Sequence, residues 1–117
     1  MQILLNTDSH ITGSEALTRL TEDIVEGAVG RFGTRITRVE VHLADENSTH
    51  KQGEHDKRCA MEARLAGLPP ITVTEQGSTL QQALESAAET LEKALNRKLG
   101  RLDDRHDPVP MGGEPMA

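Results

Sequence analysis

The hydrophobic period changes twice along the chain, and these changes constrain the fold more than any other feature of the sequence. In residues 36–43 apolar and polar residues alternate, which is the pattern of a strand with one buried face. The same alternation returns in residues 58–65 and 71–74, with a Gly-Leu-Pro-Pro turn at residues 67–70 between them. Three successive strands joined in this way predict an antiparallel meander.

On both sides of this meander the apolar residues recur at three- and four-residue steps, which is the period of an amphipathic helix. The first stripe comprises Leu17, Leu20, Ile24, Ala28 and Phe32, and the second comprises Leu80, Leu84, Ala87, Leu91, Leu95 and Leu99. We therefore expect one helix from near Gly13 to residues 30–33 and a longer one that ends at about Leu102.

Each predicted helix is preceded by a hydroxyl residue at capping-box spacing. Thr12 stands three residues before Glu15, and Ser78 stands three residues before Gln81. A hydroxyl at this spacing accepts a hydrogen bond from a free backbone N–H, and the Glu or Gln side chain bonds back to the cap. Thr12 and Ser78 are the predicted N-caps.

A short apolar run in residues 2–6 predicts a further strand before the first helix. The element order is then strand, helix, three strands, helix. Because each clear strand has only one apolar side, both helices should cover the same face of a four-stranded sheet. The expected fold class is α+β, a two-layer sandwich of order β-α-β-β-β-α. Residues 1–102 form this domain, and residues 103–117, which are rich in Pro and Gly, form a disordered tail.

Cysteine and histidine usage argues against a metal site or a catalytic centre. Cys59 is the only cysteine, and it belongs to the apolar side of its strand. His42, His50 and His55 have no recognised zinc-ligand spacing. No Gly-rich phosphate loop, nucleophile elbow or catalytic acid pair is evident. We expect no metal, no cofactor, no small-molecule substrate and no enzymatic activity.

The N-terminal residues lack the basic region and long apolar run of a signal peptide. No segment approaches the roughly 20 apolar residues that span a bilayer. A single cysteine also suits a reducing compartment. These features predict a cytoplasmic protein without a membrane partner.

A formal net charge of −6 opposes binding to a phosphate backbone, but the charges are unevenly distributed. Lys93, Arg97, Lys98 and Arg101 lie together with no acid between them. Lys93, Arg97 and Arg101 are four residues apart, so they share one face of the second helix and could follow a phosphate backbone. Alternatively, the cluster complements the negative end of the helix dipole, at about 0.3–1 kcal/mol per charge.

A second basic area is predicted on the strands. Arg38, Arg58 and Arg64 should lie on the side of the sheet that faces away from the helices, with Arg35 and Lys57 nearby. Acidic residues of the same strands interrupt this area. On the pattern alone, cross-strand ion pairs on a solvated face are favoured over nucleic-acid contact.

The order of these elements resembles that of the short hibernation-promoting and ribosome-associated inhibitor proteins, also called sigma-54 modulation proteins. The resemblance covers about residues 1–102 and depends on several segments in order, since no short motif is diagnostic. The segments are Met-Gln-Ile at residues 1–3, Ile-Thr at residues 11–12 before Glu-Ala-Leu at residues 15–17, the run at residues 35–43, the loop end at residues 56–58, and the Leu-rich final helix.

The resemblance implies a fold like that of a double-stranded-RNA-binding domain. It also implies a protein that lodges in the messenger and transfer RNA channel of the small ribosomal subunit and blocks translation in resting or stressed cells. The family's final helix carries basic residues that meet ribosomal RNA, and the matching positions here are Lys93 and Arg97. Thr90, where relatives often have Lys, departs from the family pattern, as does the overall acidity.

The resulting hypothesis is a non-enzymatic translation regulator that binds 16S rRNA of the 30S subunit. The predicted RNA-binding residues are Lys93, Arg97 and Arg101, helped by Arg38, Arg58 and Arg64. The alternative is a protein-interaction module that uses the acidic first helix or an exposed sheet edge and does not bind the ribosome. Neither hypothesis predicts an oligomeric state.

Overall fold

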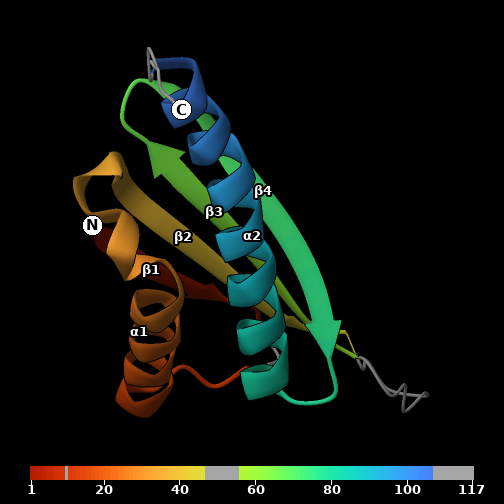
Figure 1. Cartoon of the computed structure of the whole chain (residues 1–117). Coiled ribbons are helices and arrows are strands. Elements are labelled where there is room, and N and C mark those ends of the chain that lie inside the picture. The colour runs from red at the N-terminus through yellow and green to blue at the C-terminus, as the bar shows by residue number, and fades with distance from the viewer. Residues whose placement is uncertain (10, 47–55, 107–117) are drawn as a thin grey trace.

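The computed structural model describes residues 1–9, 11–46 and 56–106, with side chains described as far as Arg101. Its elements are β1 (Gln2–Thr7), α1 (Glu15–Val29), the 3-10 helix η1 (Gly30–Arg35), β2 (Ile36–Asp45), β3 (Lys57–Leu65), β4 (Leu68–Gly77) and α2 (Leu80–His106). The strands form one four-stranded sheet, and both helices lie on the same face of it (Figure 1). The predicted fold class and element order are confirmed.

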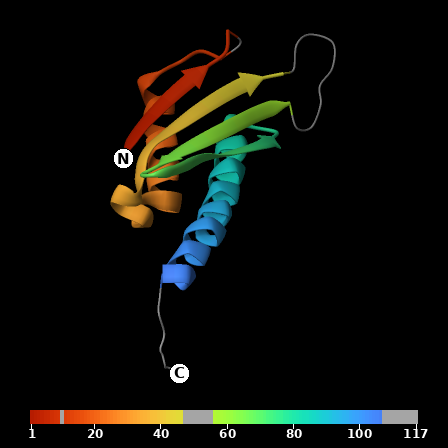
Figure 2. The ribbon, with the colours of Figure 1, turned by 90° about the horizontal axis from the view of Figure 1, so that it is seen from above.

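The sheet is mixed, with strand order β1-β2-β3-β4. The β2, β3 and β4 strands form the predicted antiparallel meander, whereas β1 pairs with β2 in parallel. Two parallel neighbours cannot be joined by a hairpin and need a crossover connection. The α1 helix and η1 supply that crossover, which places α1 over the β1 side of the sheet and leaves the β4 side to α2 (Figure 2).

The core lies between the helices and the inward rows of β2 and β3. Register pairs apolar residues with one another: Val39 with Ala63, Val41 with Met61, and Leu43 with Cys59. The α2 helix adds Leu84, Leu91, Leu95 and Leu99, all at most 3% exposed, as its sequence stripe predicts. Burying each Val, Leu or Met side chain contributes about 1.5–3 kcal/mol, so this core supplies most of the driving force for folding.

Both helix caps lie later than the sequence predicts. Ser14, not Thr12, caps α1, and its Oγ accepts a hydrogen bond from the Leu17 N–H at 3.0 Å. Thr79, not Ser78, caps α2, and its Oγ1 accepts from the Gln82 N–H at 3.0 Å. Each cap lies in a segment with two hydroxyl residues, and either hydroxyl can satisfy an N-terminal N–H. Spacing alone therefore did not select the correct one.

The buried face of α1 is rotated from the predicted stripe. The predicted residues are only half-buried, whereas Thr21, Val25 and Val29 are fully buried. Thr21 is polar and does not belong to the predicted apolar stripe. Its hydroxyl donates to the Leu17 carbonyl at 2.9 Å, so it enters the core without an unsatisfied donor.

The turn before β4 is shorter than predicted. The turn consists of Ala66 and Gly67, and Gly67 has a φ of +74°, which favours glycine. The strand β4 begins at Leu68 and therefore includes Pro69 and Pro70, which the sequence pattern places in the turn. Proline lacks the N–H needed by a central strand, but β4 is an edge strand with one unpaired side.

At the other end of the chain, α2 continues to His106, four residues past the predicted end at Leu102. Residues 47–55, between the predicted strands at 36–43 and 58–65, and residues 107–117 of the predicted tail lie outside the described residues. The division into a domain and a disordered tail therefore stays a prediction. None of the described helices is long and apolar enough to cross a bilayer.

One prediction concerns the close contact between the end of β4 and the start of α2. A Cβ on Gly77 would lie 2.7 Å from the backbone nitrogen of Ala83, which cannot move without displacing the helix. We expect Gly77→Ala to lower the free energy of unfolding by about 1–3 kcal/mol, measured by urea denaturation followed by circular dichroism.

Gly27→Ala is the matched control. Gly27 lies inside α1 and has no neighbouring atom within 4 Å of an added Cβ. This change should raise the free energy of unfolding by about 0.4–1 kcal/mol, because alanine favours the helix. Equal stability of Gly77→Ala and the wild type would contradict the predicted clash.

A second prediction concerns Cys59, which is 0% exposed. Burial raises the pKa of its thiol to about 12, because desolvation disfavours the thiolate. At pH 8 the native thiol should therefore react with a disulfide reagent only as fast as the protein opens, and immediately once it is unfolded in guanidinium. Cys59→Ala should cost about 1 kcal/mol. Rapid labelling of the native protein would show that the thiol is accessible.

Candidate nucleic-acid interface

The predicted cations of the second helix share one exposed face of α2. Lys93, Arg97 and Arg101 are all exposed, and none belongs to the core. We call this set the α2 basic strip. At a rise of 1.5 Å per residue its ends lie about 12 Å apart along the helix axis. Lys98 is only partly exposed and lies outside the strip, as predicted.

Contacts on either side of α2 fix the direction in which the strip faces. Thr90 precedes Lys93 by three residues, and its hydroxyl donates to Glu75 Oε2 of β4 at 2.9 Å. Helix geometry places residues three, seven and eleven after Thr90 on the same side. The strip therefore follows the outward surface of α2 on its β4 side.

The opposite side of α2 faces α1 and η1. Arg31 donates to Glu92 Oε2 and to Asn96 Oδ1, each at 2.7 Å, while its guanidinium carbon lies 4.5 Å from the centroid of the Phe32 ring. This clamp connects η1 to the middle of α2. It also leaves the strip on the side of α2 away from α1.

The strip keeps most of its charge available for an external partner. Lys93 Nζ lies 3.6 Å from Glu89 Oε2, and both side chains are about two-thirds exposed. An exposed i,i+4 pair of this kind contributes only about 0.3–0.5 kcal/mol and yields readily to a stronger anion. Among the residues whose side chains are described, none forms an ion pair with Arg97 or Arg101.

The position of the strip argues against the helix-dipole alternative. The α2 helix ends at His106, so Arg101 stands five residues before the end and Lys93 thirteen. The favourable interaction of a cation with the dipole falls off within the last turn of a helix. The strip lies farther from the C-terminus than the dipole acts effectively.

The second predicted basic area lies on the face of the sheet opposite the helices, which we call the open face. Its Arg38 and Arg64 are Cα partners, as are Glu40 and Glu62. Opposite charges are therefore neighbours along each strand: Arg38 lies 2.8 Å from Glu40, and Arg64 lies 3.7 Å from Glu62. The predicted cross-strand ion pairs are wrong for these two arginines, because the register aligns like charges.

Cross-strand pairing does occur at the loop end of the meander. Lys57 Nζ lies 3.4 Å from Asp45, its partner across the strands, and 3.1 Å from Asp56. The hydrogen bond to Asp56, followed by the charge of Asp45, raises the pKa of Lys57. Arg58 lies 3.3 Å from Glu46, which directly follows β2 and which strand alternation does not identify as a partner. These cations are less available than those of the strip.

The exposed acidic side chains of the helices lie on α1 and on the first half of α2, and we call this the acidic helical surface. The exposed acids are Glu15, Glu22, Asp23 and Glu26 of α1 and Glu85 and Glu89 of α2. Among the helical residues whose side chains are described, these acids are therefore separate from Arg97 and Arg101. In the part of the chain that the structure describes, no group of three or more His, Cys, Asp or Glu residues is placed to bind a metal ion, and His50 and His55 lie outside that part.

The sequence matches the model of a known protein family. The sigma 54 modulation protein / S30EA ribosomal protein family matches residues 6–103, which include α1, η1, β2, β3, β4 and most of α2. The chain belongs to this family. Membership confirms the resemblance that the order of sequence elements predicts. Among curated proteins the sequence has no significant match.

Solved structures share the fold of this S30EA family member. A ribosomal subunit interface protein from Coxiella burnetii matches with a TM-score of 0.67 at 17% identity, over 86% of this chain and 99% of its own. The N-terminal domain of Thermus thermophilus Protein Y matches with a TM-score of 0.66 at 18% identity, over 84% of this chain and 99% of its own. At these identities the likeness establishes the fold and not the individual contacts.

Proposed function

We propose that this chain is a ribosome-associated regulator of translation that binds the small ribosomal subunit through the α2 basic strip. The observation that carries the proposal is the strip itself: Arg97 and Arg101 are exposed, without ion-pair partners among the described side chains, and directed away from the acidic helical surface. Family membership and the name of the Coxiella burnetii neighbour, a ribosomal subunit interface protein, point to the ribosome as the partner.

Binding through the strip is electrostatic and depends on shape. Cations spaced about one helical turn apart can follow successive phosphates of 16S rRNA, and each contact releases a condensed counterion. The acidic surface of α1 then has to face away from RNA, because phosphate would repel it. The strip therefore sets both affinity and orientation. Arg38, Arg58 and Arg64 can add contacts once RNA competes with their carboxylate partners.

The proposed mechanism is steric occlusion, without a chemical step. The protein acts in the cytoplasm of resting or stressed cells, lies in the messenger and transfer RNA channel, and excludes the normal ligands by its volume. Such a role needs a rigid body rather than a catalytic centre. The aliphatic core and the Arg31 clamp supply that rigidity.

Sedimentation of a resting-cell lysate through sucrose gradients tests the partner. We expect the protein to co-migrate with 30S and 70S particles at low salt and to move toward the top of the gradient at high salt, because counterion release drives binding. Recovery only at the top of the low-salt gradient would refute ribosome association.

A third prediction concerns the strip. Reversing Lys93, Arg97 and Arg101 to Glu should abolish co-sedimentation. Replacing them with Gln should reduce the magnitude of the slope of log K against log salt by about three, roughly one for each lost phosphate contact. The fold should survive both changes, because these side chains are exposed. Circular dichroism checks the fold, and wild-type co-sedimentation of the triple Glu variant would show that another surface binds.

The matched control reverses Glu22 and Glu26 of α1 to Lys. Both residues are exposed, so the fold should tolerate the change. If the strip binds RNA, ribosome association stays the same or strengthens. If the chain is instead a protein-interaction module built on its acidic helix, this variant loses its partner while the strip variants keep theirs.

A further inference from the structure

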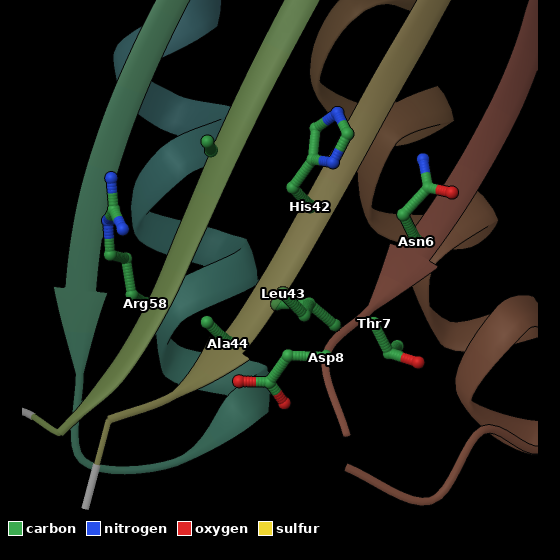
Figure 3. Close-up of a pocket in the computed structure, with 8 residues that line it drawn as sticks. Asn6, Thr7, Asp8, His42, Leu43, Ala44 and Arg58 are labelled. Atoms are coloured by element: carbon green, nitrogen blue, oxygen red, sulfur yellow. The ribbon is translucent and has the colours of Figure 1, made fainter. Parts of the chain in front are cut away.

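The open face carries a pocket that the proposed function does not use. It has a volume of about 430 Å³ and lies where β1 ends beside β2 and β3 (Figure 3). Its lining includes Asn6 from β1 and Asp8 just after it, His42 and Ala44 from β2, and Arg58 and Ala60 from β3. This volume falls within the range of sites that hold small molecules.

The pocket exists because two alanines replace large side chains on the open face. Ala60 is the Cα partner of His42 on one side and of Thr74 on the other, and Ala44 is the partner of Arg58. In the next row toward the start of β2, the paired residues are Glu40 and Glu62. The two methyl groups thus form a shallow apolar floor between polar side chains.

The polar side chains of the rim have spare hydrogen-bonding capacity. No hydrogen bond engages the amide of Asn6 among the described residues. The His42 side chain is 53% exposed, and its Nε2 lies 3.7 Å from Glu40, beyond hydrogen-bond distance. Arg58 directs one nitrogen to Glu46 at 3.3 Å, which leaves other N–H groups of its guanidinium unused within the described residues.

The two sides of the pocket carry opposite charges. Figure 3 shows Asp8 on the β1 side and Arg58 on the β3 side, with His42 between these strands on β2. The Asp8 Oδ2 oxygen accepts from the Asp45 N–H at 3.2 Å, which fixes the carboxylate at the rim. A simple anion would be repelled by Asp8 and a simple cation by Arg58. A ligand that fits both must carry hydrogen-bond donors at one end and negative charge at the other.

We propose that this pocket binds a single nucleoside monophosphate unit. The base lies on the Ala44 and Ala60 methyls beside the His42 ring, its polar edge faces Asn6 and Asp8, and its phosphate reaches Arg58. Unstacked bases are recognised in this way, by a ring surface together with hydrogen bonds from side chains. His42 carries the only aromatic ring that the described strands place on the open face.

The proposal rests on the proposed function only for the source of the nucleotide. The α2 basic strip and the pocket lie on opposite layers of the sandwich, so a chain enclosed by RNA can contact it from both sides. A nucleotide extruded from that RNA and a free nucleotide share the same chemistry. The experiment must therefore distinguish the two sources.

The test is an NMR titration of the ¹⁵N-labelled full chain with each of the four nucleoside monophosphates, with inorganic phosphate, and with a short single-stranded oligoribonucleotide. We expect saturable shifts of the backbone amides of Asn6, His42, Ala44, Arg58 and Ala60 with at least one monophosphate. The two affinities are compared in the variant with Lys93, Arg97 and Arg101 replaced by Gln, which removes RNA contacts of the strip. There, affinity at least tenfold higher for the oligoribonucleotide identifies RNA as the source, and equal affinity identifies the free nucleotide.

Ala60→Leu fills the pocket from the open face without entering the core, and it should abolish these shifts. Thr72→Leu is the matched control, since Thr72 is exposed on the same face but does not line the pocket. His42→Ala should weaken binding about tenfold through lost stacking. The strip variant with three Glu residues should still bind the monophosphate, so failure of the ribosome proposal and failure of this one are separable.

Three results would overturn the proposal. The first is the absence of shifts at the pocket with every nucleotide and with the oligoribonucleotide. The second is an equal response to inorganic phosphate, which would mean that the base contributes nothing. The third is unchanged binding by Ala60→Leu, which would place the ligand elsewhere.

Discussion

The packing of two helices on one side of β2 and β3 is the constraint on which the other features depend. The inward rows of these strands are Ile, Val, Leu, Met, Ala and Cys, and no aromatic residue is fully buried. A core of small aliphatic side chains gains contact only when its layers approach closely. The small side chains of Ala83, Ala87 and Ala88 on α2 permit that approach. At the last residue of β4, Gly77 permits it too, because a Cβ there would collide with the backbone of α2.

Because the core fills the space between the helices and the sheet, the charged residues lie on the two outer surfaces of the sandwich. The outer side of α2 carries a strip whose two arginines have no ion-pair partner among the described side chains, whereas the open face carries arginines that each have a carboxylate neighbour. A net charge of −6 is therefore compatible with local affinity for phosphate. The exposed acids of the two helices lie on α1 and the first half of α2, apart from the two arginines of the strip.

Sequence reasoning succeeded where a local period determines the structure. The alternation in residues 36–43 and 58–65 identified the buried rows of β2 and β3, and four-residue spacing identified the face of α2 that carries Lys93 and Arg97. It failed where the outcome depends on contacts that the period does not contain. Thr21 is buried with its hydroxyl bonded to a carbonyl of its own helix, and two prolines are tolerated in β4 because it is an edge strand of the described sheet.

The same distinction separates the two candidate sites. The α2 basic strip belongs to one helix and can be read from its spacing. The pocket on the open face combines residues from three strands, and no pattern within a single strand indicates that Ala60 stands beside His42. Strand register also decides that Arg38 faces Arg64 rather than an acid. Both facts follow from pairing between distant segments, which a single sequence does not specify.

The parallel pairing of β1 has a consequence for the order in which the protein assembles. The β2, β3 and β4 strands and α2 follow one another along the chain, and all but the loop between β2 and β3 are joined by short turns. By contrast, β1 reaches β2 only after α1 and η1 have been placed, and it makes a ladder with that one strand. Closing this longer loop costs more entropy before any contact repays it. We therefore expect β1, although it precedes β2, β3 and β4 in the chain, to be secured last, and the pocket that it helps to form to be completed only then.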